Sequence, residues 1–331
     1  MSLTNSFWSA LGFSVVLSAI SNTGIAQESL RPIRVGLFVS GFASEYAGHD
    51  RGLIAGLRDR GYIEGKNLTV ERRYGNLDMQ RISGFAQELA KSELDAIVTV
   101  CTVTTRAAVG ATNRTPIVML SVSDPVGYGL AASLARPGTN VTGRSNLSRT
   151  LVPKLVELFH DSVPRADRIA VLLNGHNPLH EPLWAEAVIA AQALKLNLIR
   201  IEGHLPGDFE VATRRVLSSK ANALLVLPDD PPSLHLRPQI AAFAKEHRLP
   251  LINPYGDFSD DEALLSYGEN LETTSQLAAA HIDKIIRGAS AAELPIEQPT
   301  RFQLTVNLNV ARHLGVTIPA TILVRADRVL E

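Results

Sequence analysis

The same succession of segments occurs twice along this chain of 331 residues. Each series opens with a short apolar run, turns on small polar residues, continues into an amphipathic stretch and returns to another apolar run. The first series starts at Ile33–Ser40, and the second starts at Ile169–Asn174, after a break at Pro164–Arg168. Strands that alternate with helices form parallel sheets with right-handed crossovers. The sequence therefore predicts an α/β protein with two doubly wound parallel-sheet lobes and a cleft between them.

Short apolar runs place the strands, and apolar residues at helical spacing place the helices between them. In the first lobe we expect strands at 33–39, 68–74, 96–100 and 116–120, and a turn-rich exit at Gly138–Gly143. In the second lobe we expect strands at 169–173, 197–201, 223–227, 250–252 and 263–267. A late strand at 302–307 is expected to return to the first lobe, and Pro319–Glu331 is expected to be a surface tail. The predicted boundaries are 32–145 plus about 288–331 for the first lobe, and 146–287 for the second.

The first 26 residues bear on the destination of the protein. They contain no Asp, Glu, Lys or Arg, and the apolar run Phe7–Ile20 is shorter than the roughly 20 residues of a membrane span. We interpret residues 1–26 as a signal peptide, cut after Ala26, that exports the protein to the periplasm. This segment has no cysteine, so no lipid anchor is expected. The alternative is a buried or disordered N-terminal tail.

Charge and cysteine content exclude several classes of function. The formal net charge is -1, which gives no electrostatic reason to expect a nucleic-acid partner. Cys101 is the only cysteine, so an intrachain disulfide and a four-cysteine zinc site are excluded. The composition, 45% hydrophobic and 20% charged, is that of a globular protein with material for two cores.

Ligands of open parallel sheets bind beyond the carboxyl ends of the strands, so the residues that follow each apolar run are the candidates. They are mostly small hydroxyl and amide residues, with carboxylates and two tyrosines. The candidate ligand-binding residues are Ser40, Gly41, Cys101, Thr102, Ser123, Asp124, Asn174, Asp229, Tyr255 and Tyr267. Helix N-termini after several of them favour an anion, a carboxylate among Asp124, Asp229 and Asp230 would pair with an ammonium group, and the tyrosines would stack on a ring or close the cleft. A zwitterionic ligand would match this set.

Each candidate also has a simpler interpretation. Ser, Asn and Asp before a helix are most often N-caps, and Asp229 and Asp230 before Pro231 would only start a helix. The two tyrosines would be half-buried rim residues, and Cys101 a small buried hydrophobic residue. The hypothesis therefore depends on the positions of the whole set and not on any single member.

Catalytic and metal-binding motifs are absent from the sequence. It contains no Walker A loop, no Gly-x-Gly-x-x-Gly after the first strand, no Gly-x-Ser-x-Gly elbow and no His-Glu-x-x-His spacing. His176 and His180 are four residues apart, but Pro178 lies between them, so a metal site is not expected there. We expect neither enzyme activity nor a cofactor.

A set of motifs resembles a known family. The set comprises Arg34–Leu37, Gly61–Asn67, Ser123–Gly127, Leu134–Gly143, Leu265–Gly268 and Leu294–Phe302. Together they resemble the periplasmic ABC-transporter substrate-binding proteins related to the tryptophan- and tyrosine-binding type. The resemblance runs through nearly the whole chain after the leader, and its most specific stretch is Leu134–Gly143 (LARPGTNVTG).

The resemblance implies a type I periplasmic-binding fold with three hinge crossings. It also implies that a small solute, such as an amino acid or a derivative, is captured by hinge closure and delivered to an ABC permease and its ATPase. The protein would be a monomer that meets the membrane only through the permease and binds no nucleic acid. Cys101-Thr102 stands where many relatives have a glycine-rich turn, which leaves the ligand open. The alternatives are a ligand-sensing regulatory or signalling protein of the same fold, and an enzyme.

Overall fold

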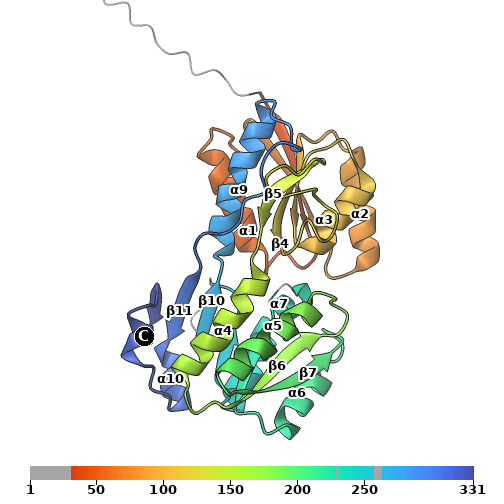
Figure 1. The fold of residues 1–331 in the computed structure, drawn as a ribbon. Helices are drawn as coiled ribbons and strands as arrows, with labels where there is room; N and C mark the ends of the chain where they lie inside the picture. The colour runs from red at the N-terminus through yellow and green to blue at the C-terminus, as the bar shows by residue number, and fades with distance from the viewer. Residues whose placement is uncertain (1–30, 229, 257–262) are drawn as a thin grey trace, which may run out of the picture. The chain divides into compact units, whose positions relative to one another are not determined.

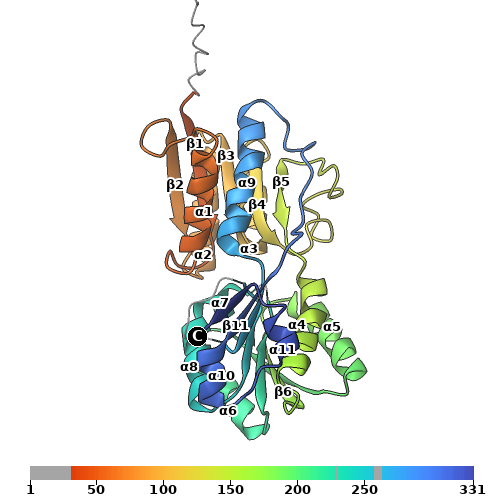
Figure 2. The same cartoon turned by 90° about the vertical axis from the view of Figure 1, so that its left-hand side faces the viewer.

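The computed structural model describes residues 31–228, 230–256 and 263–331. The chain from Arg31 to Glu331 forms one compact unit. This unit contains two sheets, each covered by helices, which form the cores of two lobes (Figure 1, Figure 2). The two-lobed α/β architecture predicted from the repeated strand–helix pattern is confirmed.

The first lobe is built on a five-stranded sheet of order β2-β1-β3-β4-β5, in which every pairing is parallel. Its strands are β1 Ile33–Val39, β2 Leu68–Tyr74, β3 Ala96–Val100, β4 Ile117–Val122 and β5 Val141–Ser145. Helices α1 Ala47–Arg58, α2 Met79–Lys91 and α3 Thr102–Ala111 connect them. The β3 run is buried at all five positions, as expected for a strand covered on both faces. The segment predicted only as a turn-rich exit also supplies β5.

Helix α9 (Leu271–Ile286) returns to the first lobe and packs along α1 (Figure 1). Glycine makes this approach possible, because a Cβ atom at Gly52 would lie 2.0 Å from the carbonyl oxygen of Glu272. Arg51 also donates a hydrogen bond of 2.9 Å to the Glu272 carboxylate. The predicted second lobe, 146–287, included this helix, so the chain re-enters the first lobe earlier than predicted.

The second lobe is built on a seven-stranded sheet of order β12-β11-β10-β9-β8-β6-β7. Its strands are β6 Arg168–Asn174, β7 Asn197–Gly203, β8 Ala223–Val226, β9 Leu251–Asn253, β10 Leu265–Gly268, β11 Gln303–Asn307 and β12 Arg328–Leu330. Its helices are α4 Ser148–Ser162, α5 His180–Ala193, α6 Phe209–Ser218, α7 Pro231–His235, α8 Arg237–Glu246, α10 Leu308–Leu314 and α11 Ala320–Leu323. The pairings are parallel except for β10 with β11, which is antiparallel.

The placement of the late strand corrects the sequence prediction. Strand β11 does not return to the first lobe, because it pairs with β10 and buries Leu304 and Val306 in the core of the second lobe. The segment predicted as a surface tail also belongs to this lobe, where it forms α11 and the edge strand β12. The first lobe therefore receives α9 from the end of the chain, whereas the second lobe receives 303–330.

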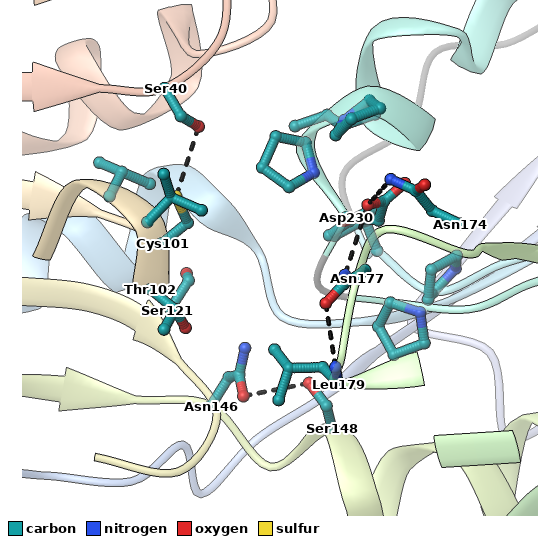
Figure 3. A pocket seen from close by; sticks show the side chains of 18 of the residues that line it. Ser40, Cys101, Thr102, Ser121, Asn146, Ser148, Asn174, Asn177, Leu179 and Asp230 are labelled. Carbon is teal, nitrogen blue, oxygen red and sulfur yellow. Dashed lines mark hydrogen bonds between the residues drawn. The ribbon is translucent and has the colours of Figure 1, made fainter. Parts of the chain in front are cut away.

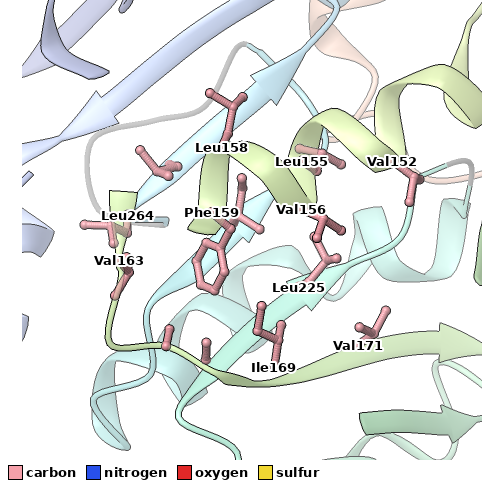
Figure 4. Close-up of a cluster of buried hydrophobic side chains, with 14 of the residues drawn as sticks. Val152, Leu155, Val156, Leu158, Phe159, Val163, Ile169, Val171, Leu225 and Leu264 are labelled. Atoms are coloured by element: carbon pink, nitrogen blue, oxygen red, sulfur yellow. The ribbon is translucent and has the colours of Figure 1, made fainter. Parts of the chain in front are cut away.

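Helix α4 anchors the core of the second lobe (Figure 4). One face of the helix buries Leu155, Phe159 and their neighbours against Ile169 of β6 and Leu225 of β8. Replacement of a buried leucine by alanine in such a core costs about 2–5 kcal/mol. Because α4 begins directly after the first crossing between lobes, this packing fixes the end of that crossing to the second sheet.

Within the described residues the chain crosses between the lobes three times, as predicted. The crossings lie between β5 and α4, between β10 and α9, and between α9 and β11. The third crossing leaves the first lobe beside β5, because Glu297 N–H donates to the Gly143 carbonyl and Ser145 N–H donates to the Glu297 carbonyl, each at 2.9 Å. The buried Arg144 side chain also pairs with the Glu297 carboxylate. No described helix has the length and apolar character needed to span a membrane.

Candidate functional site

A cavity of about 650 Å³ lies between the two lobes. Ser40 and Cys101 line it from the first lobe, and Asn174 and Asp230 line it from the second (Figure 3). Ser40 and Cys101 follow β1 and β3, Asn174 ends β6, and Asp230 lies in the loop after β8, so the cavity lies at the carboxyl ends of strands from both sheets. A site of this kind is assembled only when both lobes contribute their walls.

The wall from the second lobe is organised around the buried carboxylate of Asp230, which is 2% exposed. Its Oδ1 atom accepts hydrogen bonds from the side-chain amides of Asn174 at 2.9 Å and Asn177 at 3.3 Å (Figure 3). Its Oδ2 atom accepts from the backbone N–H of Ser233 at 3.0 Å and from the Ser233 hydroxyl at 2.6 Å. Both oxygens are therefore engaged by the protein, and Asp230 positions its neighbours.

His180 supports the same wall from behind. The backbone N–H of Asn174 donates to His180 Nδ1 at 2.8 Å, so Nδ1 is unprotonated and Nε2 carries the proton donated to the Pro228 carbonyl at 3.1 Å. Burial lowers the pKa of His180, although the Asp230 carboxylate acts in the opposite direction. The neutral ring thus fixes the loops that follow β6 and β8.

The wall from the first lobe is made of small groups. The thiol of Cys101 donates to the Ser40 hydroxyl at 3.3 Å, and the hydroxyls of Ser40 and Tyr46 lie 3.4 Å apart. Burial raises the pKa of Tyr46 well above its usual value, so the phenol stays protonated. Cys101 precedes α3 with φ +78° and ψ 167°, a conformation that is rare outside glycine. Thr102 then begins α3, whose first-turn N–H groups have no partner within the helix.

The predicted site residues divide into three groups. Those that line the cavity are Ser40, Cys101, Thr102, Asn174 and Tyr255. Those that the structure places elsewhere are Gly41, Ser123, Asp124 and Tyr267. Asp229 lies outside the described residues. The strand-end rule thus located both walls but not each side chain on them.

Local geometry explains the residues that lie elsewhere. The exposed Asp124 accepts the backbone N–H of Gly127 at 2.8 Å and closes its own turn. An irregularity in the pairing of β4 with β5 and a φ of +55° at Ser121 bring Ser121, not Ser123, to the cavity. Tyr267 packs on Phe302 with ring centroids 5.7 Å apart. At Gly41 a Cβ atom would lie 2.7 Å from the Tyr46 ring, so this glycine permits the fold of its loop.

Three cavity residues lie next to strand ends or helix starts that the sequence did not place correctly. Asn146 directly follows β5 and Ser148 begins α4, and the Ser148 hydroxyl donates to Asn146 Oδ1 at 3.0 Å (Figure 3). Glu269 lies on the second crossing and accepts from the Thr274 hydroxyl at 2.9 Å. Asn146 and Ser148 were missed because β5 was predicted only as a turn-rich exit, and Glu269 was missed because the predicted strand ended at 267, one residue before the end of β10.

His49, in the first turn of α1, is a buried cavity residue whose ring nitrogens have no hydrogen-bond partner among the described residues. Burial lowers its pKa to about 4, so the ring is neutral at physiological pH. Its ring centroid lies 5.4 Å from that of Tyr46. A buried polar group without a hydrogen-bond partner lowers the stability of the folded protein, so His49 leaves the hydrogen bonding of the first-lobe wall incomplete.

The described residues contain no group of three or more His, Cys, Asp or Glu side chains able to hold a metal ion. The two histidines considered as a pair in the sequence have other roles. His176 stacks on His204, with ring centroids 4.0 Å apart and an interplanar angle of 1°. His180 uses both nitrogens in the hydrogen bonds described above.

With this geometry in place, comparison with known proteins decides the family. Residues 33–330 match the model of the ABC transporter substrate binding protein family. The chain belongs to this family. A curated relative, the tyrosine-binding protein of Clostridioides difficile (strain R20291), is 26% identical over 268 residues, which cover 80% of this chain and 76% of the relative.

Solved structures of similar proteins have the same fold. A conserved domain protein from Vibrio cholerae superposes with a TM-score of 0.83 at 26% identity, covering 90% of this chain and 100% of that one. An ABC domain from Streptococcus pneumonia in complex with L-Trp superposes with a TM-score of 0.80 at 21% identity, covering 89% of this chain and 100% of that one. The resemblance noted in the sequence is thereby confirmed at the level of family and fold.

Proposed function

We propose that this protein captures a small solute in the interlobe cavity and delivers it to an ABC permease and its ATPase. The observation that carries the proposal is the cavity of about 650 Å³, whose lining comes from both lobes of a member of the substrate-binding family. A ligand in this position contacts both walls only when the lobes are together. It therefore stabilises the closed form through its differential affinity for that form.

The crossings suit this motion. Three segments join the lobes, and the hydrogen bonds between Glu297 and residues 143–145 fix the start of the third segment to β5 of the first lobe. Three connections resist separation of the lobes, whereas the short segments between them and the lobes absorb changes in backbone angle during a hinge movement. Opening and closing without dissociation is the motion that repeated capture and release require.

The cavity lining favours a ligand with an apolar body and a few polar groups. Leu151, Leu205 and Phe302 are among the apolar residues that line it, together with the hydroxyl and amide groups of both walls. Small-molecule sites typically combine such surfaces, in which the polar groups fix the orientation of the ligand. The curated relative is a tyrosine-binding protein, and one solved neighbour holds L-Trp. We propose an aromatic amino acid or a derivative as the ligand class.

The proposal includes a location. The uncharged, apolar leader in residues 1–26 supports export to the periplasm without a lipid anchor, and the mature protein would work there as a monomer. N-terminal sequencing of the exported protein should find a start near Gln27. An intact Met1 on the exported protein would contradict this part of the proposal.

The ligand test is a thermal-shift screen followed by calorimetry. The panel should hold the aromatic amino acids, their deaminated and decarboxylated analogues, and small aliphatic amino acids as controls. A true ligand raises the melting temperature with its concentration and binds with one-to-one stoichiometry. Chromatography of the ligand after incubation should recover it unchanged. If no aromatic compound binds, the ligand class is overturned; if a compound is turned over, the solute-binding function is overturned.

A further inference from the structure

A side-chain contact joins the two lobes outside the cavity lining. Glu45 and Phe42 lie in the loop between β1 and α1 of the first lobe, and His235 ends α7 of the second lobe. His235 Nδ1 lies 2.8 Å from Glu45 Oε1, and the His235 ring stacks on Phe42 with centroids 4.5 Å apart and an interplanar angle of 23°. None of the three is among the residues that line the cavity.

The chemistry of the contact is well defined on the first-lobe side. A carboxylate only accepts hydrogen bonds, so His235 Nδ1 must carry the proton that it donates to Glu45. The second carboxylate oxygen accepts the backbone N–H of Phe42 at 2.8 Å, which holds the loop in a tight fold. Gly41 permits this fold, because a Cβ atom there would lie 2.9 Å from Glu45 Oε2. The Glu45 side chain is 12% exposed, so the carboxylate is largely removed from water.

On the second-lobe side the contact is attached to the cavity wall. Helix α7 begins with the Asp230 carboxylate as its N-cap and ends at His235, four residues after its first residue. Asp230 also holds Asn174 and Asn177, which line the cavity. Helix α7 thus connects Asp230, which positions the cavity residues of the second lobe, to His235, which contacts the first lobe.

We propose that Glu45, Phe42 and His235 form a latch that stabilises the closed form of the cleft independently of ligand. The inference rests on the proposed hinge movement. Separation of the lobes breaks the hydrogen bond and the ring stacking together and returns the carboxylate to water. With the latch intact, part of the ligand-free protein is already closed. The ligand then needs less differential affinity to hold the cleft shut.

The latch is tested by distance measurements on ligand-free protein. Spin labels at the exposed residues Gln87 in α2 and Ser218 in α6, in a Cys101→Ser background, report the separation of the lobes by pulsed electron resonance. His235→Ala should lower the ratio of closed to open protein about three- to tenfold, as expected for loss of one partly exposed hydrogen bond to a carboxylate and one ring contact. Small-angle scattering of the unlabelled variant should show a matching increase in radius of gyration.

His204→Ala is the matched control. His204 also pairs with a carboxylate, with Nδ1 3.5 Å from Asp208 Oδ2, and also stacks on a ring, but both partners lie in the second lobe. Its removal should leave the distribution of lobe separations unchanged. Equal distributions for His235→Ala, His204→Ala and the parent would overturn the latch, as would a protein with no open form in any variant.

Two further variants guard against an effect of misfolding. Glu45→Gln keeps a hydrogen-bond acceptor for the Phe42 N–H but loses the charge, so it should open the cleft less than His235→Ala does. A Glu45→Gln/His235→Ala double variant should open it no further than His235→Ala alone, because the two groups act as a pair. Full additivity would overturn the pairing. No ligand is present in these measurements, so a failure to find a solute would count against the proposed function alone.

Discussion

The two walls of the cavity differ in how their polar groups are hydrogen-bonded. In the second lobe, the polar side chains satisfy one another, since Asp230, Asn174, Asn177 and His180 form one connected set of hydrogen bonds. In the first lobe, the wall holds small hydroxyl and thiol groups, a helix N-terminus and His49, whose nitrogens have no partner among the described residues. We infer that the second-lobe wall is preformed and that the first-lobe wall completes its hydrogen bonding when a ligand arrives.

The difference indicates an order of events. A wall whose buried polar groups are already paired keeps its shape in the open form, so a ligand can dock on it at little cost in side-chain entropy. A wall with unpaired groups gains most from contact with the ligand, and it therefore contributes most to the preference for closure. Each prediction below alters one wall and asks whether the other behaves differently.

The largest effect is expected for Asp230→Ala. The substitution leaves the amide groups of Asn174 and Asn177 and the buried hydroxyl of Ser233 without their acceptor, and should lower the free energy of unfolding by about 4 kcal/mol. It should also weaken ligand binding, because the amides lose their fixed orientation. Urea denaturation and calorimetry measure the two effects.

Asp124→Ala is the control for that prediction. The exposed Asp124 accepts one backbone N–H and closes a local turn, so its loss should change the free energy of unfolding by no more than about 0.5 kcal/mol and leave binding unchanged. Equal destabilisation by the two substitutions would contradict the preformed second-lobe wall.

A smaller effect is expected on acidification, and it should involve both walls. Burial lowers the pKa of His180 in the second lobe and lowers that of His49 in the first to about 4. The unfolded chain takes up these protons near about pH 6.5, but the folded protein does not, so stability is present above that pH and declines as the pH falls. From its pKa, His49 alone should cost about 2 kcal/mol between about pH 7.5 and about pH 5.

His49→Gln removes this titration and should flatten the acid side of the stability profile by that amount. His313→Gln, at an exposed histidine, is the control and should follow the wild-type profile. Unfolding midpoints in urea across this pH range provide the measurement. A parallel decline in wild type and His49→Gln would show that burial of His49 is not what makes the first-lobe wall sensitive to acid.

The sequence predicted strands more successfully than it predicted their partners. Strands Leu68–Tyr74 and Ala96–Val100 have the predicted bounds. The second is a fully buried run in which four of five residues are β-branched, a composition that favours a strand locally. The prediction that β11 belongs to the first lobe was wrong, because its pairing with β10 depends on contacts that are distant in the sequence. Ser121 lines the cavity where Ser123 was predicted, because a backbone irregularity changes which side chain faces the cavity. No local sequence pattern indicates such an irregularity.

The smallest effect is expected at Cys101, where the strained residue of the first-lobe wall can be relaxed. Its φ of +78° with ψ 167° favours glycine, and a non-glycine residue there costs of order 1–3 kcal/mol. Cys101→Gly should therefore raise the free energy of unfolding by about 1 kcal/mol, after the loss of the thiol contact and the greater flexibility of the unfolded chain are allowed for. It should also weaken ligand binding, because it removes a side chain that lines the cavity.

Cys101→Ala separates the two causes, since it keeps the Cβ atom and its strain but loses the hydrogen bond from Sγ to Ser40. It should be less stable than wild type by under about 1 kcal/mol. If urea midpoints show that stability falls from Gly to Cys to Ala at this position, the first-lobe wall tolerates a strained cysteine because its side chain forms part of the surface that faces the ligand. If glycine proved the least stable of the three, the conformation at Cys101 would not be a source of strain, and the contrast between an adaptable and a preformed wall would rest on hydrogen bonding alone.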